Sequence, residues 1–430
     1  MKKKYELGRF AILRRSDHFE IVSPAGGIYS FDEKSIKKLL NFHGKIPSIK
    51  KSNLEVTALK EGLLLRSSQP KQPFQIKKVL NNINDKSKNI LTLSDLAIII
   101  TKKCNYNCLG CSVDAGISKN TKNVNWKKII SDGASFGAIN LAISGGEPLL
   151  PDGIEKVLEL ARFAKKCGYE NIVIYTNGTF VSKYAQKLKK SGVTRISISF
   201  HGFDGYSEKY TKHPNAEINS FSGIKATIKA GLYLRVNCVV TKGNIFQVEH
   251  IIKELIPIIK GDEENYLRFS PVIEIGRASN KKNNLSIDEY NKLITIVAKY
   301  KPKYGEKIRL TCDEECFVDD PVFCDAGLVC AIVNEKGIIS PCDLLESISP
   351  IDSIGEKDFI DIWNDNNKWG NFRKVIEINP VCGSCEKSIR KICIGKCKAL
   401  ALIKFGSLTM NKEPKKCLHK SLNKRKGVSI

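Results

Sequence analysis

LAIIITKKCNYNCLGC, residues 96–111, joins an apolar run to three closely spaced cysteines. The run has the length and composition of a buried strand, and Cys104, Cys108 and Cys111 follow it with C-x3-C-x2-C spacing. Three thiolates on one loop can hold three irons of a cubane cluster, whereas a cluster that only transfers electrons normally has four cysteine ligands. The spacing therefore predicts an iron–sulfur cluster with one iron open to a small molecule.

Two other uses of these cysteines fit less well. A structural zinc site requires four nitrogen or sulfur ligands, and the next cysteine after Cys111 is Cys167. Disulfide bonding would leave one of the three cysteines unpaired. The motif therefore favours an open cluster over a zinc site or a disulfide.

Composition indicates a metal-dependent protein of the cytoplasm. The chain has 430 residues, 42% of them hydrophobic, and no window approaches the ~20 consecutive apolar residues of a membrane span. The basic N-terminus has no apolar core behind it, so we expect no signal peptide and no membrane. Fifteen cysteines in a reducing compartment indicate metal binding or catalysis, and ten of them lie within residues 312–417.

The net charge of +25 allows two interpretations. An electropositive groove would suit an acidic peptide or a nucleic acid. Lysines are spread along the whole chain without one basic stripe, however, so we attribute most of the charge to general composition.

The distribution of apolar residues divides the chain into four parts. Residues 1–70 predict paired strands followed by a helix that Asp32 caps. Residues 71–94 have the polar composition of a linker. Residues 95–290 alternate apolar runs with amphipathic stretches, and residues 291–430 hold a bridging region and the cysteine-rich block.

The alternation between residues 95 and 290 is typical of an α/β fold with a parallel sheet. Six apolar runs read as strands: residues 97–101, 138–144, 171–176, 195–200, 234–241 and 266–272. Six strand–helix units predict an open, TIM-like partial (β/α)6 barrel with its site at the carboxyl ends of the strands. Ser286 and Glu289 form a capping-box pattern that begins a further helix.

A second motif follows the second predicted strand, where Gly145, Gly146 and Glu147 come directly after Ser144. Paired glycines let the backbone approach a ligand closely. The carboxylate behind them can hold an ammonium group. Because the motif lies one strand after the cysteine loop, the two are expected to serve one site.

Together the two motifs resemble those of radical S-adenosylmethionine (SAM) enzymes. Cys104, Cys108 and Cys111 match the family's cluster motif, with Tyr106 at its usual aromatic position, and Gly145, Gly146 and Glu147 match the segment that binds the methionine amino group. The resemblance implies that SAM chelates the open iron and is cleaved by one electron, and that a 5′-deoxyadenosyl radical abstracts hydrogen from the substrate. The protein then positions the reactants and excludes water.

Polar residues at later strand ends match further family positions. Thr176, Asn177, Ser199 and Asn237 lie where the family contacts the ribose and carboxylate of SAM. The alternative is that these side chains cap strand–helix turns.

Three other positions are candidate site residues, although each differs from the family's usual pattern or has more than one possible role. His201 stands where the family usually has Asp, and it is a candidate base or a turn residue. Lys212 stands where an Arg often binds the SAM carboxylate, so a point charge would replace a bidentate fork. Arg277 lies in a Gly-Arg-Ala segment common in related maturases and would face SAM or a backbone carbonyl.

The C-terminal cysteines resemble the SPASM extension, which carries two auxiliary clusters, making three [4Fe-4S] clusters in all. By that resemblance one auxiliary cluster is held by Cys324, Cys330, Cys342 and Cys397, and the other by Cys382, Cys385, Cys393 and Cys417. The roles of Cys312 and Cys316 stay open, and one of them could replace Cys324. A pair of zinc sites is the rival interpretation.

Asp343 directly follows Cys342. In the sulfatase-maturase branch of SPASM proteins, an Asp at this place is thought to take a proton from the substrate. The alternative is a solvated or turn-capping carboxylate.

The N-terminal part of the sequence gives an indication of the substrate class. Residues 1–70 resemble a winged-helix element that pairs the leader of a ribosomal peptide with a sheet edge; a structural cap over the barrel is the alternative. We therefore expect a maturase that installs a cross-link, a thioether or an epimerised residue on a ribosomally made precursor peptide, with an electron donor such as flavodoxin or ferredoxin.

Two other functions are kept. One is a sulfatase-type maturase that oxidises a Cys or Ser. The other is a nucleic-acid-binding metalloprotein, which is disfavoured because the sequence has no basic recognition helix with interleaved aromatics.

Overall fold

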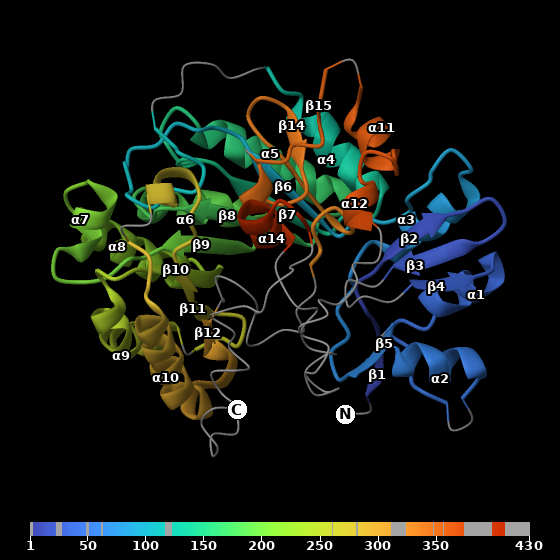
Figure 1. The fold of residues 1–430 in the computed structure, drawn as a ribbon, viewed down its shortest axis with the longest axis horizontal. Helices are drawn as coiled ribbons and strands as arrows, with labels where there is room; N and C mark the ends of the chain where they lie inside the picture. The colour runs from blue at the N-terminus through green and yellow to red at the C-terminus, as the bar shows by residue number, and fades with distance from the viewer. Residues whose placement is uncertain are drawn as a thin grey trace.

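The core of this computed structural model is a ten-stranded sheet in the order β12-β11-β10-β9-β8-β7-β6-β13-β14-β15 (Figure 1). Neighbouring strands run parallel from β12 to β13, and β14 and β15 continue the sheet antiparallel. The structure describes residues 3–22, 28–48, 51–61, 63–116, 123–259, 261–280, 283–310, 324–346, 348–355, 357–373 and 398–408.

The six predicted strands form the centre of this sheet, and the α/β fold with a partial parallel barrel is confirmed. Four further strands, not predicted from the sequence, extend its two edges. The ten strands are β6 (Asp95–Ile99), β7 (Asn140–Ser144), β8 (Asn171–Thr176), β9 (Arg195–Ser199), β10 (Tyr233–Val240), β11 (Tyr266–Pro271), β12 (Ile308–Leu310), β13 (Cys330–Val333), β14 (Ile338–Ser340) and β15 (Asp352–Ser353).

Helices connect the parallel strands and cover one face of the sheet (Figure 1). They are α4 (Trp126–Ser135), α5 (Ile154–Cys167), α6 (Val181–Lys190), α7 (Tyr206–Thr211), α8 (Ala216–Lys229), α9 (Val248–Ile259) and α10 (Ile287–Tyr304), with 3-10 turns at Ile245–Gln247, Gly276–Asn280 and Gly305–Lys307. The predicted capping box begins α10, because the Ser286 and Glu289 side chains each accept a hydrogen bond from the other's backbone N–H.

The two faces of the sheet differ in chemistry. In β10, Leu234, Val236 and Cys238 are buried in the core shared with the helices. Arg235 and Asn237, which alternate with them, are only partly buried on the opposite face. We call this second side, which carries polar side chains, the inner face.

The N-terminal part has a core of its own. Strands β2 (Ala11–Arg14), β3 (Phe19–Val22) and β4 (Ile28–Phe31) form an antiparallel sheet, and β1 (Lys4–Leu7) pairs with β5 (Leu64–Ser67). Helices α1 (Glu33–Leu40) and α2 (Asn53–Lys60) lie beside them (Figure 1). Arg9 pairs with Asp95 at the start of β6 and with Asp325, which ties this part to the central sheet.

Residues 71–94, predicted as a linker, contain a packed helix instead. Helix α3 (Ile76–Asn84) buries Val79 and Ile83, four residues apart on one face, in the N-terminal core. Ile76 and Leu80, partly buried, pack against the same core, so the helix docks although the segment around it is polar.

The C-terminal part adds short elements to the edge of the sheet. Besides β13–β15 these are a 3-10 turn at Asp343–Leu345, α11 (Phe359–Asn364), α12 (Gly370–Arg373) and α14 (Lys398–Phe405). Within the described ranges, no helix combines the length and the hydropathy needed to cross a bilayer.

Candidate functional site

The three-cysteine loop follows β6 at the carboxyl edge of the sheet. Cys104, Cys108 and Cys111 are partly buried free thiols. The Tyr106 backbone N–H donates to Cys104 Sγ at 3.3 Å, and the Ala115 N–H donates to Cys111 Sγ at 3.2 Å. Backbone donors aimed at sulfur favour the thiolate form that a metal requires.

Burial and the proximity of neighbouring thiols oppose charging Cys104 and Cys108 when no metal is bound. Burial raises the pKa of Cys108 to about 12, and its neighbours Cys111 and Cys104 add to the shift. Burial likewise raises the pKa of Cys104 to about 11. A cationic group bound between the three sulfurs would offset both effects, so the donor set fits a metal group.

The donor set of the loop suits an iron–sulfur cluster. In a cubane cluster each thiolate binds its own iron, and the loop supplies three thiols. Cys104, Cys108 and Cys111 are therefore the residues that would hold the predicted cluster. Within the residues that the structure describes, no three His, Cys, Asp or Glu side chains form a site for one metal ion.

The glycines after β7 are needed for close contact with this loop. A Cβ on Gly146 would lie 2.2 Å from the Lys103 carbonyl oxygen, and one on Gly145 would lie 2.3 Å from that of Thr101. The Gly146 N–H donates to the Thr101 carbonyl, and the Glu147 N–H donates to the Lys103 carbonyl, both at 2.8 Å. The contact that requires glycine here is with the cysteine loop itself.

Glu147 joins the ends of β7 and β8. Its carboxylate is fully buried and accepts hydrogen bonds from the Thr176 hydroxyl at 2.8 Å, the Asn177 N–H at 2.8 Å and the Leu149 N–H at 2.9 Å. Burial raises its pKa to about 7. These donors fill three of roughly four acceptor positions of a carboxylate, which leaves room for one more donor such as an ammonium group.

Asn177 also connects β8 to the cysteine loop. Its side chain donates to Asn105 Oδ1 at 2.8 Å, and the Thr179 hydroxyl donates to the Tyr106 hydroxyl at 3.0 Å. Tyr106, Thr176 and Asn177, predicted separately, are thus brought together. Asn105 and Thr179 were missed, because their part in the site depends on two loops meeting in space.

Arg277 supports the cysteine loop from the far edge of the sheet. Its Nε donates to the Cys108 carbonyl at 2.8 Å, and its Nη1 donates to the Ala115 carbonyl at 2.6 Å and to Asp114 Oδ1 at 2.8 Å. The sequence predicted that Arg277 would face either SAM or a backbone carbonyl, and the described hydrogen bonds include two backbone carbonyls. Arg277 therefore positions the loop.

His201 and Tyr210 lie behind the same loop. The Leu109 N–H donates to the Tyr210 carbonyl at 2.9 Å, and the ring centroids of His201 and Tyr210 are 4.3 Å apart. Burial lowers the pKa of His201 to about 4, so its imidazole is neutral near pH 7. Lys212 ends α7 with a left-handed backbone (φ 57°) and is exposed.

Ser199 and Asn237 lie side by side on the inner face. They are register partners in β9 and β10, and Arg268 in β11 is the partner of Asn237 on the other side. The Ser270 hydroxyl donates to Asn237 Oδ1 at 3.3 Å. The predicted pair is therefore in one row with Arg268, which was not predicted because strand register is not visible in the sequence.

The described C-terminal cysteines surround a small buried cluster. Cys324 and Cys342 pack against Ala326, Leu345, Phe372 and Ala399, and Cys330 begins β13 beside Asp95 of β6. The predicted ligands Cys382, Cys385, Cys393, Cys397 and Cys417, with the unassigned Cys312 and Cys316, lie outside the described residues.

Asp343 is exposed and begins the 3-10 turn that follows Cys342. Desolvation raises its pKa, and the Arg268 guanidinium opposes that shift. Asp343 therefore lies close enough to Arg268 for their charges to interact.

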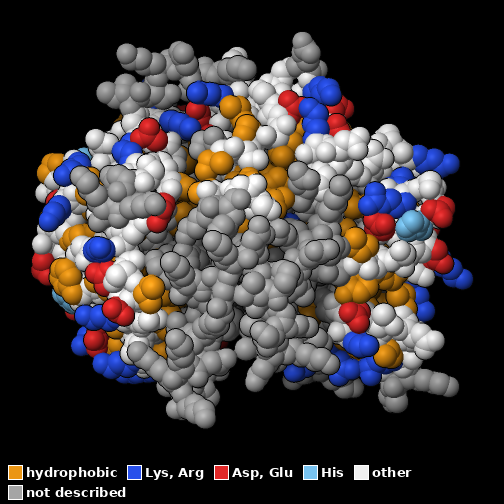
Figure 2. Space-filling model, viewed as in Figure 1, with side chains coloured by type: hydrophobic (Ala, Val, Ile, Leu, Met, Phe, Trp, Pro, Cys, Tyr) orange, Lys and Arg blue, Asp and Glu red, His pale blue; other side chains and the backbone are white. Residues whose placement is uncertain are grey.

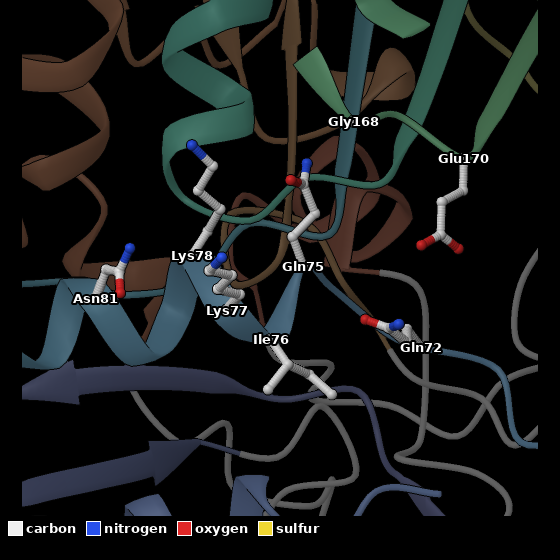
Figure 3. Close-up of a pocket in the computed structure, with 8 residues that line it drawn as sticks. All are labelled: Gln72, Gln75, Ile76, Lys77, Lys78, Asn81, Gly168 and Glu170. Carbon is white, nitrogen blue, oxygen red and sulfur yellow. The ribbon is translucent and has the colours of Figure 1, made fainter. Parts of the chain in front are cut away.

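A surface pocket lies at the opposite, amino edge of the sheet (Figure 3). It lies between α3 and the start of β8 and is lined by Gln72, Gln75, Ile76, Lys77, Lys78, Asn81, Gly168 and Glu170. None of the predicted site residues lines it, and we assign it no role.

Comparison with known proteins identifies relatives. Residues 98–255 match the model of the Radical SAM superfamily. A probable GTP 3′,8-cyclase of Sulfurisphaera tokodaii is 30% identical over 224 residues, covering 51% of this chain and 67% of that protein. An AdoMet-dependent heme synthase of Methanosarcina barkeri is 27% identical over 345 residues, covering 73% and 93%. A PqqA peptide cyclase of Methylobacterium nodulans is 23% identical over 316 residues, covering 70% and 81%.

Solved structures share the fold. Streptococcus suis SuiB bound to precursor peptide SuiA matches with a TM-score of 0.63 and 18% identity, over 96% of this chain and 100% of that one. The structure of anSMEcpe with bound AdoMet and Cp18Cys peptide matches with a TM-score of 0.56 and 19% identity, over 74% and 92%.

Proposed function

This chain belongs to the radical SAM superfamily, and we propose that it is a maturase that modifies a ribosomally made precursor peptide. The modification would be a cross-link, a thioether or an epimerised residue. The observation that carries this proposal is the extent of the structural similarity, which reaches 96% of the chain for SuiB but 74% for anSMEcpe. The additional coverage favours a SuiB-like protein over a sulfatase-type maturase.

The residues around the cysteine loop have different roles in the proposed site. Cys104, Cys108 and Cys111 hold the cluster, Arg277 fixes the loop, and Glu147 with the backbone of Gly146 receives the amino group of SAM. When bound, the cluster and SAM supply a 5′-deoxyadenosyl radical that abstracts a hydrogen atom. Ser199 and Asn237 contact the ribose or carboxylate of SAM, and Thr176, Asn177 and Tyr106 hold the adjoining strand ends in place.

The N-terminal residues 1–70 would bind the leader of the precursor. In the described residues β4 pairs only with β3, so its other edge can accept an extended peptide as a further strand. Ile28 on this strand is 43% exposed and offers an apolar contact.

The C-terminal residues would hold two auxiliary [4Fe-4S] clusters, making three in all. The first would use Cys324, Cys330, Cys342 and Cys397, and Lys398, next to Cys397 in sequence, lies close enough to Cys324 and Cys342 to interact with their charges. The second would use Cys382, Cys385, Cys393 and Cys417. Flavodoxin or ferredoxin would supply the electron.

A sulfatase-type maturase that oxidises a Cys or Ser is the second candidate, because Asp343 is exposed and lies near enough to Arg268 to interact with its charge, where it could accept a proton from the substrate. A nucleic-acid-binding protein is disfavoured. Figure 2 shows basic side chains interspersed with acidic ones on the visible face, without a continuous basic stripe.

The first experiment tests SAM cleavage. Protein reconstituted with iron and sulfide, then given dithionite and SAM without peptide, should form 5′-deoxyadenosine. Cys108→Ala should abolish the product, whereas Cys167→Ala, which removes a thiol at the end of α5, should not. Equal activity of the two variants would contradict the assignment of the loop.

The second experiment tests the substrate. A short peptide encoded beside the gene would be incubated with the reconstituted protein and SAM, then analysed by mass spectrometry and chiral amino-acid analysis. A cross-link or thioether removes two hydrogen atoms, and epimerisation changes configuration at constant mass. An unchanged peptide, with turnover of a Cys or Ser substrate instead, would favour the sulfatase-type maturase.

A further inference from the structure

An arginine on the inner face bridges three strands of the sheet. Arg235 in β10 donates from Nη1 to the Tyr175 hydroxyl in β8 at 2.7 Å and from Nε to the Tyr266 hydroxyl in β11. Arg309 lies over the Tyr266 ring, 4.0 Å from its centroid. Tyr175 is 38% exposed, so this group of side chains is open on one side.

The positive charge of Arg235 is not neutralised by the described residues. Arg195, on the same face, is paired with Glu264 at 2.8 Å, but no carboxylate among the described residues lies within ion-pair distance of Arg235, whose partners there are two phenols. Burial and then the neighbouring Arg235 charge lower the pKa of Arg268, and Asp343 acts in the opposite direction. A recessed guanidinium favours an anionic partner, and its planar fork suits a carboxylate.

The position of Arg235 places that partner beside the reacting region. Arg235 and Asn237 share a face of β10 two residues apart, which is roughly 7 Å along a strand. Arg268 is the register partner of Asn237. A group held by these arginines would therefore lie next to the predicted SAM contacts.

The carboxylate of SAM is expected nearer to β7 than to Arg235, so a different anion suits Arg235 better. The SAM amino group is expected at Gly146 after β7, and the SAM amino and carboxylate groups are attached to the same carbon. Strand β10 is the third strand from β7, which at about 4.8 Å per strand is roughly 14 Å.

From these observations we propose that Arg235, with Arg268 beside it, binds a carboxylate of the peptide substrate, from an Asp or Glu side chain or the C-terminus. This inference rests on the proposed peptide-modifying function. It adds a determinant of specificity, since the modified residue would have an acidic group at a fixed distance.

The test is a selection of peptides by the intact, reconstituted protein in the presence of SAM. A synthetic library of random peptides, half with free and half with amidated C-termini, would be captured by the wild type, by Arg235→Gln and by Arg162→Gln. Arg162, exposed on the helix-covered side in α5, controls for the loss of one positive charge. Recovered peptides would be sequenced, and SAM affinity and peptide-free 5′-deoxyadenosine would be measured for each protein.

We expect the wild type and Arg162→Gln to enrich an acidic residue, or a free C-terminus, at one fixed position. Arg235→Gln should lower that enrichment about tenfold or more while still forming 5′-deoxyadenosine. Should the Gln variant fail to fold, Arg235→Lys keeps the charge but loses the bidentate fork, and we expect the enrichment to fall with it.

The outcomes separate this inference from the proposed function. Absence of 5′-deoxyadenosine from the wild type would overturn both. Formation of 5′-deoxyadenosine with no acidic preference, or with a preference that both Arg235 variants retain, would overturn the inference alone. A loss of SAM affinity in Arg235→Gln with unchanged peptide preference would assign the arginine to SAM and also overturn it.

Discussion

The first cysteine loop and the C-terminal cysteines are built in different ways. Residues 101–111 are held by contacts from four other segments: Gly146 after β7, Asn177 after β8, Tyr210 in α7, and Arg277. Cys324, Cys330 and Cys342 are spread over a longer segment of short elements around a small apolar cluster. The comparison indicates that the first loop is shaped by protein contacts, whereas the second region depends more on bound metal for its order.

The largest expected effect comes from the close contact at the first loop. Gly146→Ala would place a Cβ 2.2 Å from the Lys103 carbonyl oxygen and should displace the loop. We expect loss of the first cluster and of 5′-deoxyadenosine formation, measured by iron content and product analysis. Gly261→Ala is the control, because nothing lies within 4 Å of its added Cβ; a Gly146→Ala protein with a full set of iron would contradict the role of the contact.

A change in the second region should separate iron content from SAM cleavage. With three clusters, Cys330→Ser should lower iron from about twelve to about eight per chain, because one auxiliary cluster loses a ligand. Peptide-free 5′-deoxyadenosine formation should continue, since the first loop is untouched. Cys167→Ser serves as the matched control, and unchanged iron in Cys330→Ser would remove Cys330 from the ligand set.

The support of the first loop by Arg277 predicts a smaller effect. Arg277→Lys keeps the charge but cannot make both carbonyl contacts, which should cost about 1–3 kcal/mol of loop stability. Iron should then be released faster to a chelator than from the wild type. Arg162→Lys, at an exposed helix position, should release iron at the wild-type rate. Equal rates for both variants would mean that the Arg277 hydrogen bonds to the loop are not needed to retain iron.

The smallest effect is a pH dependence from His201 behind the first loop. Its pKa falls from 6.5 to about 4 in the folded protein because of burial. As the pH falls, the His201 imidazole therefore takes up a proton in the unfolded chain before it does so in the folded protein. The free energy of unfolding should decrease as the pH falls from 6.5 towards 4, by up to about 1.4 kcal/mol per pH unit. Urea unfolding at several pH values should show a shallower slope for His201→Gln; an unchanged slope would exclude this imidazole as the source.

Sequence patterns predicted the repeated elements better than the irregular ones. The six apolar runs became β6–β11, and the Ser286–Glu289 box begins α10 as predicted. Strands β12–β15 are two to four residues long, too short to give a period, and they form because a sheet edge is available. Helix α3 was missed because its four apolar residues, Ile76, Val79, Leu80 and Ile83, lie within a longer polar segment.

The candidate site shows the same division. Residues in local motifs, such as Cys104, Cys108, Cys111 and Glu147, can be found from spacing alone. Arg268 and Arg235 could not be connected with Asn237, because their relation depends on strand register and on which face each side chain occupies.

From the sequence alone come the family, the parallel α/β plan and the donor atoms of the first cluster, since each depends on residue type at short spacing. Tertiary structure decided what the glycines contact, that Glu147 is hydrogen-bonded to the neighbouring strand, and that Arg235 on the inner face donates to two tyrosine hydroxyls. The physical reason is that these properties belong to segments far apart in the chain, which only folding brings within hydrogen-bonding distance.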